Sequence, residues 1–587
     1  MQLRKDIPEI YKWDIGLFKT EEEIEKALKV IEESTENANK YYGKFNNKDI
    51  FFDYFYSNLD TYILTHKLYH YVGNMQSIDG ADTNMKKLVQ RIEVLSTKNQ
   101  QAYSFVDPQL SKLSTKYLKE LLLDPRSKDI ENIIKSLIIS KKHSLDEKTS
   151  KVIADLTMSF CNNRSLYDTI TDLEMPFEDA VDSNGKTYPI KEATFRQYIT
   201  SSDRQLRHSA FNSIMNGYSK FNQTLAALYI KDIQSDNAFV KLEKFKTNLE
   251  KTLFDYVPEK VFRNNIKYVT ENISLLQEFV ATTAKLSKLE NFSYFDLFID
   301  EKISGETTIE QGQEIMINSL APLGKDYISR VKQKLADKSI DYMPNKDKSS
   351  GAYCSNCYNA KTLILMNWVN DFDSLSTLTH EMGHCINAEY FNEFQPFYKA
   401  EIPIFSAEIA STVNEILLNQ YMLKNCNENE KLYYLKAFLN QVRSTIFRQT
   451  LFTEFELYSH ECIENEIPIT QEELNNKYYE LNKKYYGQSC VLPENLQYEW
   501  SRIPHFYRPY YVFTYSTGLL TAITIAQKLL SEKDFAEKYI YFLKNGSNKK
   551  PVEILKEIGI DLTTEKPYKT AFKFIKEQLE KYKSLCK

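Results

Sequence analysis

Apolar residues recur at helical intervals along most of this 587-residue chain. Near the N-terminus, Ile24, Leu28 and Ile31 lie three and four positions apart, which places them on one face of a helix. Thr20 precedes this run and Glu23 follows three residues later, the spacing of a capping box at the start of a helix. Similar patterns fill residues 50–75, 84–122, 128–142, 203–240 and 256–290. The pattern therefore predicts a mostly α-helical fold.

Two segments depart from the helical pattern. Residues 176–195 contain Asn184-Gly185 between short extended runs, which is typical of a β-hairpin. Residues 341–368 contain alternating and then apolar extended residues, ending in "TLILMNW", and they predict a small sheet. We expect a boundary just after the hairpin, with an N-terminal helical region at 1–200 and a second region, which carries the chemistry, at 201–587.

Composition and charge exclude several classes of protein. Apolar residues make up 42% of the chain, enough for a large core, while 15 Gly and 16 Pro are few for an all-β protein of this length. The net charge of -5 is not the basic excess of a nucleic-acid-binding protein. No stretch approaches the ~18 uninterrupted apolar residues of a membrane span. Eight dispersed cysteines and the lack of an apolar leader predict reduced thiols and a cytoplasmic location.

The stretch "LTHEMGHCIN" at 378–387 is the first candidate for chemistry. His380 and His384 are four residues apart, so on a helix both imidazoles leave the same face. Two such ligands suit tetrahedral zinc, and Glu381 beside them can reach a water at an open metal position. The alternative is an ordinary helix with two histidines, and a third ligand would decide between them. The apolar side of the helix that carries both histidines would consist of Leu375, Leu378, Met382 and Ile386. The candidates for its N-cap are Asp371 and Asp373.

A third ligand is available in "FSAEIASTVNEILLNQY" at 405–421, which has the apolar spacing of another helix. Glu408, 24 residues beyond His384, can complete a site of two histidines and one glutamate that leaves one position open for catalysis. Glu415 could orient a ligand histidine through its second ring nitrogen. The alternatives are that Glu408 only favours the helix dipole and that Glu415 is only an exposed side chain.

Cys354 and Cys357 suggest a competing metal site together with the two histidines. The gap from Cys357 to His380 is longer than the ~12 to 15 residues of a zinc finger, and no second C-x-x-C exists for a four-cysteine site. A redox C-x-x-C would need a thioredoxin-like βαβ context, which is missing. We interpret both cysteines as free thiols.

Several segments together resemble oligoendopeptidase F, in the thimet oligopeptidase family of zinc peptidases. They include "IPEIYKWDIGLF", "SGAYCSNCY", "LTHEMGHCINAEYF", "AEIASTVNE", "RQTLFTEFELYSH" and "IPHFYRPYYVFTYSTG" and extend almost from end to end of the chain. The resemblance implies a two-lobed, mostly helical fold with a deep substrate channel, a small β-sheet near the active site, and one zinc ion at the channel floor. It also implies cleavage of short, flexible peptides.

The resemblance also implies residue roles. The zinc ligands would be His380, His384 and Glu408, and the general base would be Glu381.

The segment "IPHFYRPYYVFTYSTG", at residues 503–518, supplies the other implied roles. His505 and Tyr515 correspond to the groups that stabilise the transition state, with Tyr511 as a nearby alternative for the oxyanion and a candidate for contact with substrate. Tyr353 lies in the segment that would pair with the substrate backbone as an added strand. For each of the late tyrosines, packing in the core is the alternative.

The predicted activity is therefore metal-assisted hydrolysis of oligopeptides. Zinc would polarise the carbonyl and activate water, Glu381 would transfer the proton, and Tyr515 and His505 would donate hydrogen bonds to the oxyanion. Two rivals are a zinc carboxypeptidase or dipeptidase, which needs a cation for the terminal carboxylate, and a silent helical scaffold that binds peptides. The intact set of metal ligands and base argues against the scaffold.

Overall fold

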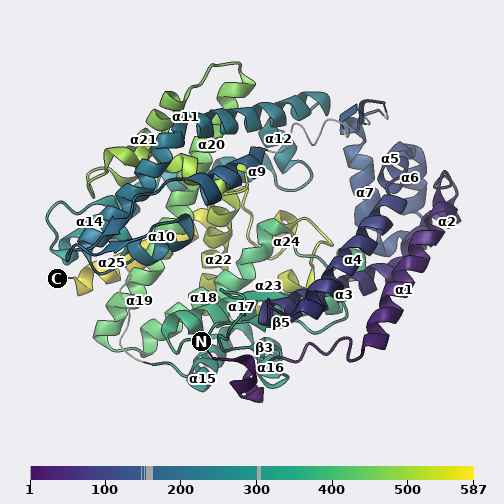
Figure 1. The fold of residues 1–587 in the computed structure, drawn as a ribbon, viewed down its shortest axis with the longest axis horizontal. Coiled ribbons are helices and arrows are strands. Elements are labelled where there is room, and N and C mark those ends of the chain that lie inside the picture. Colours follow the sequence, from purple (N-terminus) through teal and green to yellow (C-terminus); the bar gives the residue numbers. More distant parts are fainter. Residues whose placement is uncertain (1, 147, 151, 154–162, 300–305, 587) are drawn as a thin grey trace. The chain divides into compact units, whose positions relative to one another are not determined.

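In a computed structural model of the protein, helices dominate and strands are few and short (Figure 1). The structure describes residues 2–146, 148–150, 152–153, 163–299 and 306–586. The chain divides into two compact units, each made of three stretches: Met1–Ser144, Ser304–Asn425 and Ile525–Gly559 form unit 1, and Leu145–Ile303, Cys426–Thr524 and Ile560–Lys587 form unit 2. The regions 1–200 and 201–587 expected from the sequence do not coincide with these units, and that division stays a prediction.

Unit 1 contains the helices that surround the histidine motif. Its helices are α1 (Glu21–Asn37), α2 (Lys48–Ser57), α3 (Leu59–Ile78), α4 (Thr83–Ala102), α5 (Val106–Lys112), α6 (Thr115–Leu122), α7 (Glu131–Ser140), α15 (Ile309–Ser319), α16 (Lys325–Ala336), α17 (Phe372–Phe394), α18 (Ile404–Asn425), α23 (Phe535–Lys544) and α24 (Pro551–Glu557).

The described part of unit 2 consists mainly of helices and contains one β-hairpin. Its helices are α9 (Asn163–Asp168), α10 (Glu192–Ile199), α11 (Arg204–Leu242), α12 (Asn248–Leu253), α13 (Glu259–Thr270), α14 (Ile273–Ser287), α19 (Glu428–Gln441), α20 (Arg448–Glu464), α21 (Gln471–Tyr486) and α25 (Lys566–Leu585). Helix α22 (Phe513–Ser531) begins in unit 2 and ends in unit 1.

Helix α1 begins where the sequence predicts. The Thr20 side chain accepts a hydrogen bond from the Glu23 backbone N–H, while the Glu23 carboxylate reaches back one residue further than expected and accepts from Lys19 N. Its apolar face is buried against α3 and α4 in one cluster, whose members include Ile24, Leu28, Ile31, Leu68 and Ile92. Burial of this face on neighbouring helices stabilises α1 more than helix propensity does.

Both predicted β elements are confirmed. In unit 2, β1 (Ala180–Val181) and β2 (Thr187–Tyr188) pair antiparallel around a turn in which Gly185 has a φ of +80°. In unit 1, β3 (Ile340–Asp341), β4 (Tyr353–Ser355) and β5 (Leu363–Leu365) form a sheet in the order β3-β5-β4. Strand β5 is fully buried, and β4 lies at the edge of this sheet.

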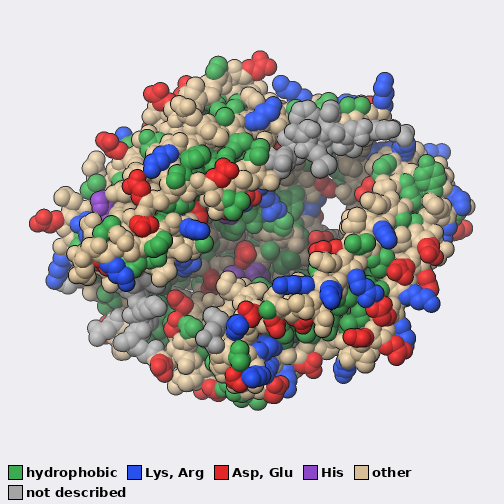
Figure 2. All heavy atoms as spheres, viewed as in Figure 1, with side chains coloured by type: hydrophobic (Ala, Val, Ile, Leu, Met, Phe, Trp, Pro, Cys, Tyr) green, Lys and Arg blue, Asp and Glu red, His purple; other side chains and the backbone are tan. Residues whose placement is uncertain are grey.

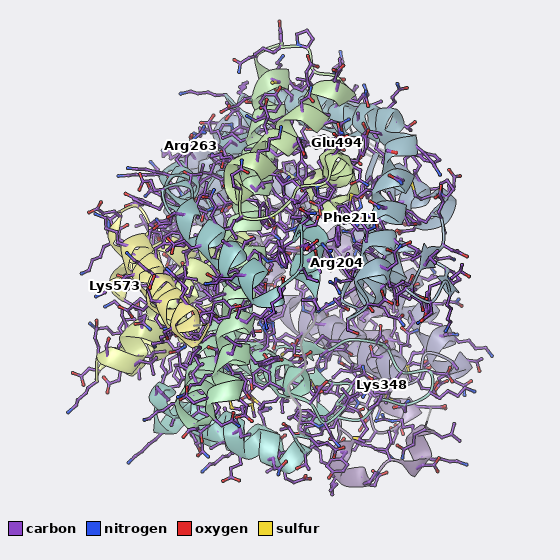
Figure 3. The ribbon with its side chains drawn as sticks, turned by 90° about the vertical axis from the view of Figure 1, so that its left-hand side faces the viewer. Arg204, Phe211, Arg263, Lys348, Glu494 and Lys573 are labelled. Atoms are coloured by element: carbon purple, nitrogen blue, oxygen red, sulfur yellow. The ribbon has the colours of Figure 1, made fainter. Side chains whose placement is uncertain are left out.

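The long helix α11 is anchored in unit 2 by ion pairs to one buried carboxylate. Arg204 and Arg207, in its first turn, both bind the carboxylate of Asp296, at 2.9 and 2.7 Å. Asp296 is buried, which would raise its pKa, but the bonds from both arginines and from the Ser293 backbone hold the pKa below its usual range. Figure 3 shows Arg204 and, two turns further along the helix, Phe211.

The surface carries charges of both signs. On the face displayed in Figure 2, Lys and Arg side chains alternate with Asp and Glu side chains, in keeping with a net charge of only -5. Among the helices of the described residues, none combines the length and the apolar character needed to cross a membrane.

Candidate metal centre and active site

Helix α17 presents its two faces as the sequence predicts. Of the two N-cap candidates, Asp371 accepts the hydrogen bond from Ser374 N, at 2.8 Å. The predicted apolar residues Leu375, Leu378, Met382 and Ile386 are all completely buried. His380 and His384 leave the opposite side of the helix and remain partly accessible.

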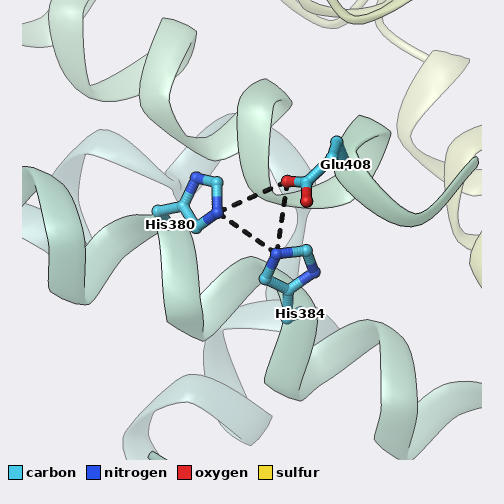
Figure 4. Close-up of side chains that lie close together, drawn as sticks. All are labelled: His380, His384 and Glu408. Carbon is cyan, nitrogen blue, oxygen red and sulfur yellow. Dashed lines mark hydrogen bonds and ion pairs between the residues drawn. The ribbon is translucent and has the colours of Figure 1, made fainter. Parts of the chain in front are cut away.

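The three predicted metal ligands meet at one point (Figure 4). The Nε2 atoms of His380 and His384 are 3.2 Å apart, and Glu408 Oε2 lies 3.5 and 3.4 Å from them. A tetrahedral zinc with ligand distances of about 2.0–2.2 Å separates its ligand atoms by about 3.3–3.6 Å. The donor set and its spacing therefore fit a divalent metal such as zinc. In the described part of the chain, this is the group of three His, Cys, Asp or Glu side chains close enough to hold a metal ion.

The approach of α18 to α17 depends on Gly383, which lies inside the histidine motif. The two helices run side by side (Figure 1). A Cβ atom at Gly383 would lie 2.6 Å from Ser411 Cα and 2.8 Å from the carbonyl oxygen of Ala410. The Asn414 amide also donates to the Thr379 carbonyl across the same contact, at 3.2 Å. This close packing brings Glu408 within reach of both histidines.

Glu415 orients His380. Its Oε1 atom lies 2.9 Å from His380 Nδ1, so this nitrogen carries a proton and Nε2 faces the other ligands. Burial alone would lower the pKa of His380, but the hydrogen bond and charge of Glu415, with the charges of Glu381 and Glu408, raise it to about 9. A metal that binds at neutral pH must therefore displace a proton from this site.

The surroundings of Glu408 favour its deprotonated, anionic form. The hydrogen bond from His384 lowers the pKa of Glu408 to about 2, against the effect of burial. Ser411, one turn further along α18, donates from its hydroxyl to Glu408 Oε2 at 3.1 Å. The carboxylate is thus charged and held in place before any metal binds.

Glu381 lies beside the ligands but has a different environment. Only 8% of its surface is exposed, and this burial raises its pKa, while the two motif histidines act in the opposite direction. The backbone N–H of Cys354, in edge strand β4, faces the Glu381 carboxylate and also acts to lower its pKa. The small sheet and the histidine helix therefore meet at the residue predicted to be the base.

Tyr353 has its side chain turned into unit 1. Its hydroxyl donates to Asn74 Oδ1 at 3.0 Å, and its ring packs on the cluster of Trp13, Ile78 and Leu365. Successive residues of a strand direct their backbone groups to opposite edges, so with Cys354 facing Glu381, Tyr353 faces β5. The backbone groups on the open edge of β4 are those of Cys354.

His505, Tyr511 and Tyr515 form a second cluster, which lies in unit 2. The rings of His505 and Tyr511 are parallel at 6.2 Å, and Tyr515 stands across both, at 6.0 Å from His505 and 5.2 Å from Tyr511. The Arg508 guanidinium covers the Tyr511 ring at 4.1 Å. Desolvation by these neighbours, followed by the charges of Arg164 and Arg508, lowers the pKa of His505 and favours the neutral imidazole.

Cys354 and Cys357 form no disulfide bond, and their interpretation as free thiols in place of metal ligands stays a prediction. Three contributions to the site were not inferred from the sequence: the space left by Gly383, the hydroxyl of Ser411 and the backbone N–H of Cys354. Gly383 carries a visible signal, because a glycine inside a helical pattern often marks a close contact. A backbone donor from a distant strand leaves no signal in side-chain identity.

Comparison with known proteins agrees with this geometry. The profile described as "Peptidase family M3" matches residues 197–574, more than half of the chain. The chain is 31% identical to "Oligopeptidase PepF" of Bacillus subtilis, over 97% of this chain and 86% of that protein. It is also 31% identical to "Oligoendopeptidase F homolog" of Borreliella burgdorferi, over 99% of both. The crystal structure of oligoendopeptidase-F from Enterococcus faecium superposes with a TM-score of 0.74 at 27% identity, covering 96% of this chain and 99% of that one.

Proposed function

The chain belongs to peptidase family M3 and is a metallo-endopeptidase, and on this premise we propose that it cleaves short unstructured peptides with one zinc ion and Glu381 as general base. One observation carries the proposal. The side-chain atoms of His380, His384 and Glu408 converge at the spacing of zinc ligands, and the buried Glu381 lies beside them.

The proposed chemistry divides between the metal and the protein. His380, His384 and Glu408 would hold the zinc ion, which would supply Lewis acidity for the scissile carbonyl and a lowered pKa for water. Glu381 takes a proton from the attacking water and passes it to the nitrogen of the leaving amine. The raised pKa of Glu381 supports this double role, because a carboxyl whose pKa lies closer to the working pH both accepts and returns a proton.

His505 and Tyr515 are the proposed hydrogen-bond donors for the oxyanion, with Tyr511 as the alternative. A well-placed donor of this kind contributes about 3 kcal/mol to the transition state. Their mutual ring contacts support a role as one group, since each ring restricts the orientation of the other two.

The open edge of β4 is the proposed binding place for the substrate backbone. Pairing with a strand edge gives affinity with little dependence on side-chain sequence, which suits an enzyme for varied short peptides. The orientation of Cys354 supports its backbone as the partner, in place of Tyr353, whose hydroxyl is bound to Asn74. A deep channel that admits only flexible chains remains part of the proposal.

Glu381→Gln tests the assignment of the base. Glutamine keeps the shape and cannot take the proton, so we expect turnover of a quenched fluorescent peptide to fall by at least ~100-fold. Zinc content, measured by atomic absorption, should be unchanged because Glu381 is not a ligand. Glu393→Gln, an exposed position on the same helix, is the matched control and should retain full activity. Near-normal turnover by Glu381→Gln at full zinc occupancy would refute the role.

A further inference from the structure

An unusual turn precedes the tyrosines of unit 2. Tyr511 N donates to the Arg508 carbonyl at 3.3 Å, which closes a four-residue turn with Pro509 second and Tyr510 third. Tyr510 has a φ of +51°. Proline in the second position and a positive φ in the third define a type II turn, whose third residue is normally glycine. A tyrosine there is strained and needs support from its surroundings.

The side chain of Tyr510 is part of the core of unit 2. Only 1% of the residue is exposed. Its ring packs edge-on against Phe262 at 5.5 Å and against the ring of His460 at 4.8 Å. These contacts fix the ring, but they do not determine the direction of the peptide group that precedes it, between Pro509 and Tyr510.

Glu456, on helix α20, supplies the contact that does so. It is completely buried, and its Oε1 atom accepts a hydrogen bond from the Tyr510 backbone N–H at 2.5 Å. Within the described residues, Glu456 Oε2, His460 Nε2 and the Tyr510 hydroxyl have no hydrogen-bond partner. Burying a carboxyl group among apolar rings is unfavourable unless it is bonded. The bond to Tyr510 is thus the identifiable benefit of this residue.

The surroundings of Glu456 favour its neutral form. Burial raises its pKa far above the usual value, and the charge of Asp236 adds to this, while the bond from Tyr510 acts in the opposite direction. A neutral carboxyl still offers its carbonyl oxygen to the backbone N–H. The bond therefore does not require a charge on Glu456.

We propose that Glu456 is a positioning residue for the reaction: it holds Tyr510 in the left-handed conformation and thereby fixes Tyr511 and Tyr515. Tyr511 is the last residue of the turn, and its carbonyl accepts Thr514 N at 3.1 Å at the start of α22. Rotation of Tyr510 to a negative φ would turn the next peptide group and shift this start. The inference rests on the proposed function, since it assumes that a late tyrosine meets the transition state.

Glu456→Met is the test, because methionine is apolar, similar in length and compatible with a helix. We expect kcat for peptide hydrolysis to fall 10- to 100-fold, with KM and zinc content little changed. Glu456→Gln keeps a carbonyl acceptor and should retain most of kcat. Glu464→Met is the matched control: Glu464 lies on the same helix and accepts a backbone N–H at 2.6 Å, but from Asn248. It should leave kcat unchanged.

A double-mutant cycle separates positioning from general packing. Glycine adopts a positive φ without strain. In a Tyr510→Gly background, adding Glu456→Met should therefore lower kcat less than threefold further. An equal loss in both backgrounds, failure of Glu456→Met to fold, or equal loss in Glu456→Gln would each overturn the proposal.

Amide hydrogen exchange gives a readout that does not depend on activity. Exchange in the peptide that covers 508–515 should be faster in Glu456→Met than in the wild type, while exchange in 372–394 stays the same. Unchanged exchange at 508–515 would overturn the proposal even if the wild type hydrolysed no peptide. Faster exchange with unchanged kcat would also overturn it, because the turn would then be held without consequence for catalysis.

Discussion

Glu408 and Glu415, two glutamates on the same helix, make different contacts with the histidines. They lie seven positions apart on α18, and each faces a histidine of α17. Glu408 lies between the Nε2 atoms of both histidines, whereas Glu415 bonds only the far ring nitrogen of His380. The sequence shows both carboxylates on one helix face, but only the contacts distinguish the proposed ligand from the proposed orienting group.

This distinction predicts an order of metal affinities. Loss of a ligand weakens metal binding outright, whereas loss of an orienting group typically costs ~10- to 100-fold. Glu408→Ala should therefore release zinc on dialysis more readily than Glu415→Ala, as measured by residual zinc per chain. Equal retention, or the reverse order, would move the third ligand away from Glu408.

The roles of Tyr511 and Tyr515 can also be separated by single substitutions. A donor used only for the oxyanion stabilises the transition state and not the bound substrate. Tyr515→Phe deletes the hydroxyl and keeps the ring contacts with His505 and Tyr511, so kcat should fall about 100-fold with KM and zinc content unchanged.

Tyr511→Phe is the matched control for this experiment. Loss of kcat in Tyr511→Phe alone would assign the oxyanion to Tyr511. Normal kcat in both variants would leave the tyrosines as packing residues, with His505 as the remaining candidate.

At the scale of elements, local patterning predicts what local forces determine. The spacing of Ile24, Leu28 and Ile31 predicts α1, and Asn184-Gly185 predicts the hairpin, because apolar faces and turn preferences belong to short segments. The same holds for α17 and its buried face.

Contacts between distant segments could not be predicted in this way. The approach of the Cys354 backbone to Glu381 brings a strand to a helix through a backbone N–H that every residue except proline has. The bond from the Tyr510 backbone N–H to Glu456 spans 54 residues and depends on a positive φ that the tyrosine side chain does not predict. Both arise from packing, which determines where an element lies and leaves little trace in its composition.

The contact of α17 with α18 provides a test at this scale. Gly383→Ala places a methyl group 2.6 Å from Ser411 Cα, so the helices must separate and Glu408 must withdraw from the histidines. We expect weaker zinc binding and a fall of about 100-fold in kcat/KM.

Gly73→Ala, inside α3, is the control for this substitution, since a Cβ there meets nothing within 4 Å. It should retain activity and raise stability by about 0.5–1 kcal/mol, measured as a small increase in Tm. Full zinc affinity in Gly383→Ala would contradict the role of this close contact.

At the scale of the whole molecule, the residues with proposed roles are divided between the two compact units. The proposed metal ligands and Glu381 belong to unit 1, and the cluster of His505, Tyr511 and Tyr515 belongs to unit 2. Each unit is assembled from three stretches of chain, which is why a single boundary near residue 200 does not describe them. The family match over 197–574 includes segments of both units.

The most direct test of this account is hydrolysis of one octapeptide by purified protein, with the products identified by mass. Metal-free protein, prepared with a chelator, should be inactive, and one equivalent of zinc should restore cleavage at internal peptide bonds. Full activity of the metal-free protein would contradict the role of the metal centre. Release of terminal residues alone would contradict the endopeptidase activity.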